Sequence, residues 1–450
     1  MNALLELLRA NKQGQSKGIY AVCSAHPMVL RAAIQQAKAD NSLLLIEATA
    51  NQVNQDGGYT GMQPSDFIQF VEGMATALGL SQQQLCFGGD HLGPVCWTAL
   101  PAAEAMAKAE TLIEAYVRAG FGKIHLDTSM PCADDPKPLP DALIAGRAAR
   151  LCQVAEQTAA SMAETASLPA PAQLCYVIGT EVPAPGGVAT LEHQLQPTPV
   201  ANVAHTINLH QQAFAALGLG VNVWQKVIAV VVQPGVEFDN TQVHAFDAVA
   251  STELADFIAK DPQLVFEAHS TDFQPQSRYQ QLVQQHFAIL KVGPQLTFAL
   301  REALFALCYI EQQLVPVEQQ SHLIAVSERV MQLQPAHWQK FYPGNAVEQQ
   351  LLRQYSFSDR IRYYWQQPEL QQAVNRLLQN LSSVAIPLPL LSQFMPLQYQ
   401  ALLNGELSGE LSSAPEALLQ HHIGLVLKMY ASACGLAGDC RVNAQRAEAA

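Results

Sequence analysis

Short apolar segments recur along the first two thirds of this chain, and each ends in a polar or charged residue. Eight of them have the length of a strand. Strands that are buried on both faces are continuous runs of Val, Ile and Leu, and helices must then cover the sheet. The alternation therefore predicts a (β/α)8 TIM barrel with a C-terminal helical extension. The predicted strands are residues 18–26, 42–47, 84–91, 123–127, 173–181, 226–233, 263–269 and 287–291.

Helices are predicted between these strands and after the last one, because apolar residues recur there at helical spacing. Residues 1–13 read as an amphipathic helix that closes the floor of the barrel. Beyond Pro316 the composition changes to Gln, Tyr, Trp and Leu, again with helical periodicity. We therefore expect a barrel over residues 1–314 and a helical extension over 315–450. The other predicted helices are residues 28–38, 64–79, 101–120, 141–164, 199–217, 243–260, 278–285 and 295–313.

Charge and cysteine content exclude several classes of protein. The formal net charge is −13 and no basic stripe offsets it, which argues against binding to nucleic acid. Nine scattered cysteines, an odd number, fit a reducing compartment and favour the cytoplasm. The N-terminus lacks the features of a secretory signal, and no apolar run approaches the roughly 20 residues of a membrane span. We expect a soluble cytoplasmic protein that binds neither nucleic acid nor membranes.

The polar residues that end the predicted strands mark the expected site. In a TIM barrel the active site gathers at the carboxyl ends of the strands, so these residues would face one another in a ring. The ring consists of His26, Glu47, Asp90, His91, Asp127, Glu181, Gln233, Glu267, His269 and Lys291.

The segment GGDHLGP places Asp90 and His91 side by side at the end of the third strand. Its glycines allow a ligand or a backbone segment to come close. At the end of a strand both side chains can reach the barrel mouth, with Asp90 as a catalytic acid or base and His91 as a metal ligand. In the alternative interpretation Asp90 caps the following turn and His91 is a hydrogen-bonded polar residue.

The second, fourth and fifth strands supply further candidates. Glu47 and Asp127 are candidate substrate-binding residues, since each ends a strand. His125 shares a strand face with Asp127 and fits a polar layer inside the barrel equally well. Glu181 is a candidate catalytic carboxylate, although a carboxylate there could also bind a metal, substrate hydroxyls or backbone amides.

Glu267 and His269 alternate along the seventh strand, so both can face the barrel axis. With His91 they could supply nitrogen and oxygen ligands to a divalent metal such as zinc. Ser270 follows in the next loop, and Lys291 ends the eighth strand. Both are candidates for substrate binding, because barrels often bind phosphate beside these two loops. An ion pair between Lys291 and Glu267 is the alternative.

Two other segments bear on function. Residues 49–63 form a long polar loop on the site face, where long loops usually serve function. The aromatic cluster at 355–365 is more typical of a core or an interface than of a cofactor site, and would mark a partner surface if exposed. Neither a Walker A segment nor a G-x-G-x-x-G segment after a strand is present, which argues against a nucleotide-dependent kinase.

Seven segments carry a resemblance to a known family. GIYAVCSAHP, IEATANQVNQDGGYTGMQP, GGDHLGP, HLDTSM, YVIGTEVPAPGG, QPGVEFD and FEAHSTDFQ, in this order, resemble the Z subunit of tagatose-1,6-bisphosphate aldolase over nearly the whole chain. The resemblance implies a class II aldolase-like barrel that binds a sugar phosphate, with Lys291 near the phosphate. It also implies a separate catalytic Y subunit as partner, in galactitol or N-acetylgalactosamine catabolism.

Against the zinc-dependent aldolase pattern, the resemblance places Asp90 on the catalytic Asp and His91 on the first zinc His. The sixth strand departs from that pattern, because Gln233 stands where a His is expected. At the seventh strand, Glu267 or His269 must stand in for a zinc His. The loss of one imidazole changes the metal affinity of such a site and its strength as an electrophile.

Two functions follow from this comparison. The first is a non-catalytic or accessory, chaperone-like subunit, required for full activity and stability of the Y subunit. It predicts an apolar docking surface and no turnover by the chain alone. The alternative is an autonomous metal-dependent sugar-phosphate aldolase or ketohexose-phosphate 4-epimerase. It predicts a bound divalent metal and loss of activity in Asp90→Asn or His91→Ala. A homo-oligomer is compatible with either.

Overall fold

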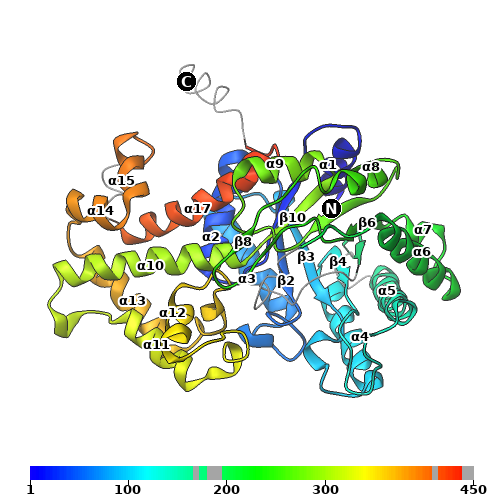
Figure 1. Cartoon of the computed structure of the whole chain (residues 1–450), viewed down its shortest axis with the longest axis horizontal. Coiled ribbons are helices and arrows are strands. Elements are labelled where there is room, and N and C mark those ends of the chain that lie inside the picture. The colour runs from blue at the N-terminus through cyan, green and yellow to red at the C-terminus, as the bar shows by residue number, and fades with distance from the viewer. Residues whose placement is uncertain (166–171, 180–194, 408–413, 438–450) are drawn as a thin grey trace.

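Eight parallel strands close into a barrel at the centre of the molecule (Figure 1). The computed structural model describes residues 1–165, 172–179, 195–407 and 414–437. Neighbours around the barrel follow the order β1-β10-β9-β6-β5-β4-β3-β2, which confirms the predicted TIM barrel with C-terminal helices. The barrel strands are β1 (Ile19–Val22), β2 (Leu44–Thr49), β3 (Leu85–Leu92), β4 (Lys123–Leu126), β5 (Cys175–Ile178), β6 (Val227–Val231), β9 (Val265–Ala268) and β10 (Phe287–Val292).

Helices cover the barrel close to the predicted positions, with one exception. The predicted helix at 243–260 is wrong over its first part, because β7 (Glu237–Phe238) and β8 (Val243–His244) pair as an antiparallel ribbon. The helix there begins only at Thr252. The helices of the barrel part are α1 (Asn2–Lys12), α2 (Pro27–Asp40), α3 (Pro64–Leu78), α4 (Ala102–Ala119), α5 (Asp141–Glu164), α6 (Val200–Ala216), α7 (Val221–Trp224), α8 (Thr252–Ala259), α9 (Gln276–Gln284) and α10 (Pro294–Leu314).

The alternation of side chains along the strands divides the core into two parts. In β1, Tyr20 faces outward and belongs to the core between the barrel and its helices. Ile19 and Ala21 face inward, where they pack with Leu4 and Leu8 of α1. Helix α1 therefore closes the amino-terminal end of the barrel with apolar side chains, as predicted. The carboxyl-terminal end is left to the polar residues described below.

The C-terminal helices extend to one side of the barrel and then return to it (Figure 1). Helix α17 packs against α2, α9 and α10, so a helix from the end of the chain helps to cover the barrel. Its Tyr430 reaches the loop after β9, where its hydroxyl lies 3.0 Å from the Thr271 hydroxyl. The helices of this part are α11 (Leu323–Leu333), α12 (Ala346–Tyr355), α13 (Pro368–Ser382), α14 (Leu388–Phe394), α15 (Pro396–Leu403) and α17 (Pro415–Ala433).

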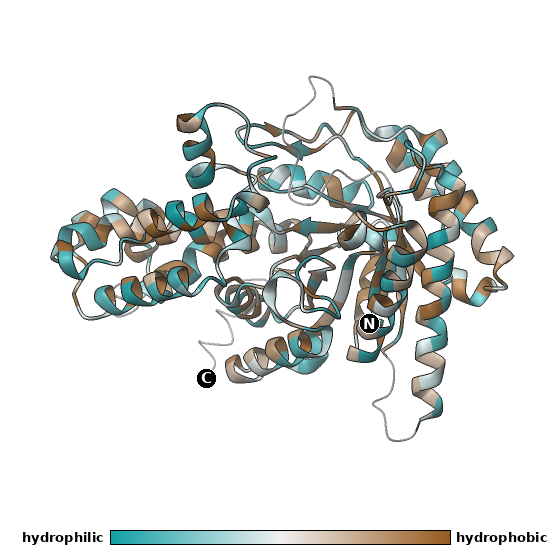
Figure 2. Ribbon diagram, turned by 90° about the horizontal axis from the view of Figure 1, so that it is seen from below, coloured by the Kyte–Doolittle hydropathy of each residue, from teal (hydrophilic) through white to brown (hydrophobic). Residues whose placement is uncertain are grey.

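Most helices are amphipathic, with hydrophobic and hydrophilic residues on different faces (Figure 2). Such helices bury one stripe against the core and expose the other to water. In the described part of the chain, no helix is long and apolar enough to cross a membrane.

Candidate functional site

A hollow opens at the carboxyl ends of the barrel strands. Two members of the predicted ring have structural roles instead. His26 accepts a hydrogen bond from the Met28 amide at the start of α2, and Gln233 accepts from two amides of its own turn. Glu181 lies outside the described residues. The predicted site residues that line the hollow are Asp90, His91, His269, Ser270 and Lys291.

A buried network of charges lies beneath this hollow. Lys123 Nζ lies 2.6 Å from a carboxylate oxygen of Glu47 and 2.6 Å from one of Glu267. Lys291 Nζ contacts Glu47 as well, and lies 2.7 Å from Asp90 and 3.7 Å from Glu267. Glu47, predicted to bind substrate, is fully buried, and both of its ion pairs are with these lysines. It therefore serves to hold the ammonium groups in place.

The network fixes the protonation states of its members. Burial alone would raise the pKa of Asp90, but the charges of His91 and Lys291 and a hydrogen bond from His125 hold it well below its usual range. Burial likewise opposes the charged form of Lys291, and the carboxylate of Asp90 outweighs it and raises the pKa of the ammonium group. At neutral pH the barrel mouth thus holds ionised carboxylates beside an ionised lysine.

The glycines of GGDHLGP make room for protein groups. A Cβ at Gly88 would lie 2.9 Å from both Cγ and Oε1 of Glu47, so only glycine leaves space for that carboxylate inside the barrel. The pairing of β3 with β4 shifts register between Gly89 and Leu92, and His91 has a φ of 51°. This left-handed backbone is unfavourable for a residue other than glycine. It turns both Asp90 and His91 toward the mouth.

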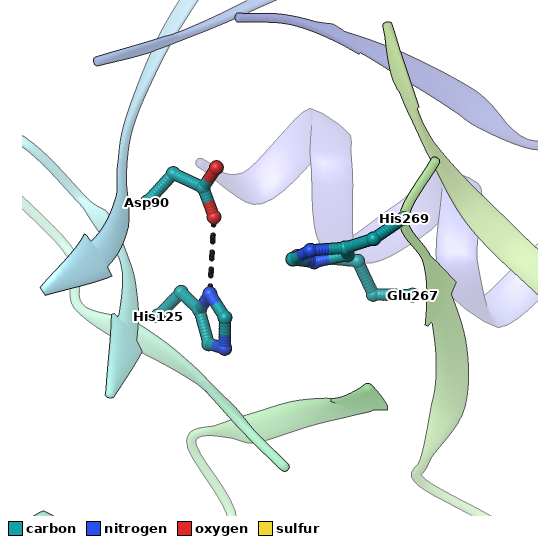
Figure 3. Close-up of side chains that lie close together, drawn as sticks. All are labelled: Asp90, His125, Glu267 and His269. Atoms are coloured by element: carbon teal, nitrogen blue, oxygen red, sulfur yellow. Dashed lines mark hydrogen bonds and ion pairs between the residues drawn. The ribbon is translucent and has the colours of Figure 1, made fainter. Parts of the chain in front are cut away.

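Four side chains from the ends of three strand segments lie close together (Figure 3). Asp90 of β3, His125 of β4, Glu267 of β9 and His269, just beyond β9, place one potential ligand atom each within 4.8 Å of the others. His125 Nδ1 lies 3.0 Å from Asp90 Oδ1, and His269 Nε2 lies 2.8 Å from Glu267 Oε1. Of the predicted metal ligands, Glu267 and His269 belong to this group.

The donor set fits a divalent cation on three grounds. Burial lowers the pKa of His269 to about 4, so its ring is neutral and can act as a ligand at pH 7. His125 Nε2 is buried and has no hydrogen-bond partner among the described residues. This nitrogen is therefore open to an ion, while Nδ1 faces Asp90. Finally, the buried carboxylates outnumber the lysines. These carboxylates are Glu47, Asp90 and Glu267, against Lys123 and Lys291.

A family model described as "D-tagatose-1,6-bisphosphate aldolase subunit GatZ/KbaZ-like" matches residues 4–435. This chain belongs to the GatZ/KbaZ-like family. The match confirms the family that the seven sequence segments predicted. The chain is also 44% identical to a solved structure from Sinorhizobium meliloti 1021, described as a "probable tagatose 6 phosphate kinase". The TM-score is 0.83, and the match covers 93% of this chain and 100% of the other.

Two solved aldolases are much more distant from this GatZ/KbaZ-like chain. The YdjI aldolase from Escherichia coli K12 is 12% identical, with a TM-score of 0.40 over 69% of this chain and 86% of that one. Fructose-bisphosphate aldolase from Campylobacter jejuni is 14% identical, with a TM-score of 0.40 over 84% and 91%. Similarities at this level do not bear on function.

His91 lies beside the four-residue group and outside it. Its Nδ1 is 2.8 Å from Asp127 Oδ2, and its Nε2 is 3.7 Å from Asp90 Oδ2. Burial opposes the charged ring, but the carboxylates of Asp90 and Asp127 raise the pKa of His91. Asp127 Oδ1 accepts from the Ser129 hydroxyl at 2.6 Å. Asp127, predicted to bind substrate, thus orients His91 in this GatZ/KbaZ-like site, and His125 takes the place expected of His91 in the group.

Residues from outside the barrel also line the mouth, and their meeting could not be predicted from the sequence. Tyr59 of the loop after β2 meets Tyr363 edge-on, with ring centroids 4.9 Å apart. Tyr363 and Arg362 belong to a short 3-10 helix, η6 (Arg360–Tyr363), and both line the hollow. The polarity of loop 49–63 and the aromatic cluster at 355–365 were the available signals, but neither shows that the two segments meet.

Proposed function

We propose that the barrel mouth of this chain binds a ketohexose phosphate and performs metal-dependent retro-aldol chemistry on it, with zinc as the favoured ion. One observation carries the proposal. Asp90, His125, Glu267 and His269 gather at the strand ends, beside a hollow and above a buried network with more carboxylates than lysines. Mixed nitrogen and oxygen donors of this kind suit zinc and related divalent ions.

His125, Glu267 and His269 would hold the ion, and Asp90 beside them would stay available for proton transfer. When bound, such an ion polarises a substrate carbonyl and stabilises the negative charge that develops on its oxygen. The neutral ring of His269 can bind an ion without loss of a proton, and His125 Nε2 has no other partner among the described residues. Glu267 is already held ionised by Lys123 and Lys291 despite its burial, as its lowered pKa shows.

The side chains of the chain itself would move the proton. Asp90 is ionised, lines the hollow and can accept a proton from the C4 hydroxyl of a bound ketohexose. The C3–C4 bond then breaks, the C4 oxygen becomes an aldehyde, and the bonding electrons enter the carbonyl at C2 as an enediolate. Lys291, 2.7 Å from Asp90, holds the carboxylate in position. Glu181 stays a further candidate for proton transfer.

The fate of the two fragments decides between cleavage and inversion. If both leave the site, the reaction is that of an aldolase. If the aldehyde turns over and the enediolate adds to its other face, the configuration at C4 is inverted and the protein is a 4-epimerase. Tyr59 and Tyr363, whose rings meet edge-on, form part of the wall of the hollow, and such a wall favours retention of the fragments. This supports the epimerase as the form of the reaction.

An accessory role beside the Y subunit is the second candidate, and the family description as an aldolase subunit favours it. The structure offers a surface for such a partner. Val347, Leu351 and Tyr355 follow one another at four-residue spacing along α12, and their exposed fractions are 74%, 57% and 44%. An exposed apolar stripe of this kind is typical of an interaction site. Docking there and chemistry at the barrel mouth are compatible.

The deciding experiment supplies D-tagatose 6-phosphate and D-tagatose 1,6-bisphosphate, with zinc, to the purified chain alone and to its mixture with the Y subunit. Triose phosphate release and formation of the C4 epimer are both measured. We expect product from the chain alone, and a loss of at least about 100-fold in Asp90→Asn and His269→Ala. Asp56→Asn, an exposed carboxylate, is the matched control. Release by the mixture only would instead establish the accessory role.

A further inference from the structure

We propose that Arg362, which the C-terminal part of the chain brings over the barrel mouth, binds the phosphate group of the ligand. This inference rests on the proposed function for the sugar, but the phosphate contact can be tested without turnover. Arg362 lines the same hollow as Asp90, His269 and Lys291, although it lies far from them in sequence. A guanidinium is suited to phosphate because it offers several N–H donors in one plane.

The positive charge of Arg362 is available to a ligand, whereas that of Lys291 is not. Lys291 is already engaged by the carboxylates of Glu47, Asp90 and Glu267. In the described ranges, Arg362 forms no ion pair. Its Nη1 donates to the Asp359 carbonyl at 3.0 Å, and its Nη2 to the Tyr363 hydroxyl at 3.4 Å. An incoming phosphate would therefore meet a guanidinium group that no carboxylate holds in an ion pair among the described residues.

The usual phosphate position of a TIM barrel is closed here. Phosphate often binds beside the seventh and eighth loops, at the backbone N–H groups of a helix start. In this chain the buried Asp272 carboxylate accepts from the amides of Gly293, at 3.1 Å, and Gln295, at 2.8 Å. Pro294, between them, has no N–H to offer. Because a carboxylate already occupies the start of α10, a phosphate needs another cationic partner.

The segment that carries Arg362 is held rigidly. Arg301 of α10 donates to Asp359 at 2.8 Å, and this pair is almost completely buried. Asp359 in turn accepts from the Ile361 amide at the start of η6. The Tyr342 hydroxyl accepts from the Arg360 amide and donates to the Ser358 carbonyl, both at 3.0 Å. Arg362 is thus preorganised, which reduces the entropy lost when a ligand binds. Asp359 acts as a positioning residue.

The test measures the binding of inorganic phosphate, D-tagatose 6-phosphate and D-tagatose by calorimetry, with the full-length protein. Arg362→Met should weaken binding of both phosphate compounds by roughly 10- to 150-fold, the range of hydrogen bonds to charged groups. Binding of D-tagatose should change little. The phosphate affinity of Arg362→Lys should lie between those of Arg362→Met and the unchanged protein, because lysine keeps the charge but lacks the planar set of donors. Asp359→Asn should weaken phosphate binding less than Arg362→Met, since Arg362 remains present.

Arg329→Met is the matched control, because Arg329 pairs with Glu369 on the exposed surface. Equal phosphate affinity in Arg362→Met and the unchanged protein would overturn the proposal, as would equal losses for D-tagatose and its phosphate. Absence of phosphate binding by the unchanged protein would also overturn it. Zinc content and C4 inversion, measured in the same variants, report separately on the proposed function. Circular dichroism shows whether each variant is folded.

Discussion

Replacement of Lys123 by Met tests the charge network beneath the site. Lys123 has no exposed surface, and its ammonium group lies 2.6 Å from both Glu47 and Glu267. Methionine keeps much of the length and packing of the lysine stem but removes the charge. Two buried carboxylates then share Lys291 as their remaining ammonium partner. Loss of one member of a buried ion pair costs about 3–5 kcal/mol of unfolding free energy, and we expect a loss in this range at pH 7.5.

The loss should depend on pH in a defined direction. Burial alone would raise the pKa of Glu267, but Lys123 and then Lys291 hold it well below its ordinary value of 4.5. A carboxylate with a lowered folded-state pKa stabilises the protein above the unfolded pKa, and this contribution disappears as the pH falls. Without Lys123, the pKa of Glu267 rises and the group takes up a proton more readily. The difference between variant and unchanged protein should therefore be largest at pH 7.5 and smaller at pH 5.

Urea denaturation of both proteins at the two pH values measures this difference. Lys108→Met is the control, since Lys108 is exposed and lies 3.6 Å from an exposed carboxylate of Asp56, so its loss should stay within about 0.5 kcal/mol. The double variant with Glu267→Gln should recover part of the loss, because it removes one uncompensated charge. A loss below about 1 kcal/mol, or one that is equal at both pH values, would refute the reasoning.

Three further predictions concern stability and are tested by urea denaturation. Leu4→Ala should lower the unfolding free energy by about 2–5 kcal/mol, because Leu4 is fully buried in the barrel floor. Gly88→Ala should cost about 1–3 kcal/mol, since its Cβ would lie 2.9 Å from the Glu47 side chain. Burial raises the pKa of Glu237 to about 7, so the stability that it contributes is complete below pH 4.5 and lost as the pH rises through 7. The unfolding free energy of Glu237→Gln should therefore equal that of the unchanged protein near pH 4.5. At pH 8 it should be larger by up to about 3 kcal/mol.

The barrel could be predicted from the sequence because its strands are buried on both faces. A segment such as VIAVVV has no polar face, so it must be covered by helices on one side and by other strands' side chains on the other. The ribbon of β7 and β8 could not be predicted in the same way. Its strands are two residues long, and its pairing depends on a turn in which Asp239 accepts from the amides of Thr241 and Gln242. The apolar residues that follow resemble a helix start instead.

The candidate site was predictable to the extent that strand geometry determines it. Glu267 and His269 alternate along one strand, so their common direction follows from the sequence. The sequence does not show which of His91 and His125 joins the four-residue group. That depends on the left-handed backbone at His91 and on the shifted register of β3 and β4. Arg362 could not be identified at all. Its position over the mouth is set by a buried ion pair between α10 and residue 359, a contact that no local pattern encodes.

The two ends of the barrel interior differ in a way that supports the proposed function. At the amino-terminal end, Ile19, Leu45 and Val265 pack with α1 in an apolar layer, the usual filling of a TIM barrel. At the carboxyl end, the same barrel buries glutamates and lysines that must all be desolvated. Apolar residues of similar volume in place of buried ion pairs often leave a protein as stable or make it more stable. A subunit that served only as a scaffold could close its barrel with a second apolar layer, and any docking to a partner would take place on the outer helices. The proposed function gives the charged layer a physical reason, because a mouth that acts on a ligand needs charged groups, and such chemistry would be compatible with an accessory role on the outer helices.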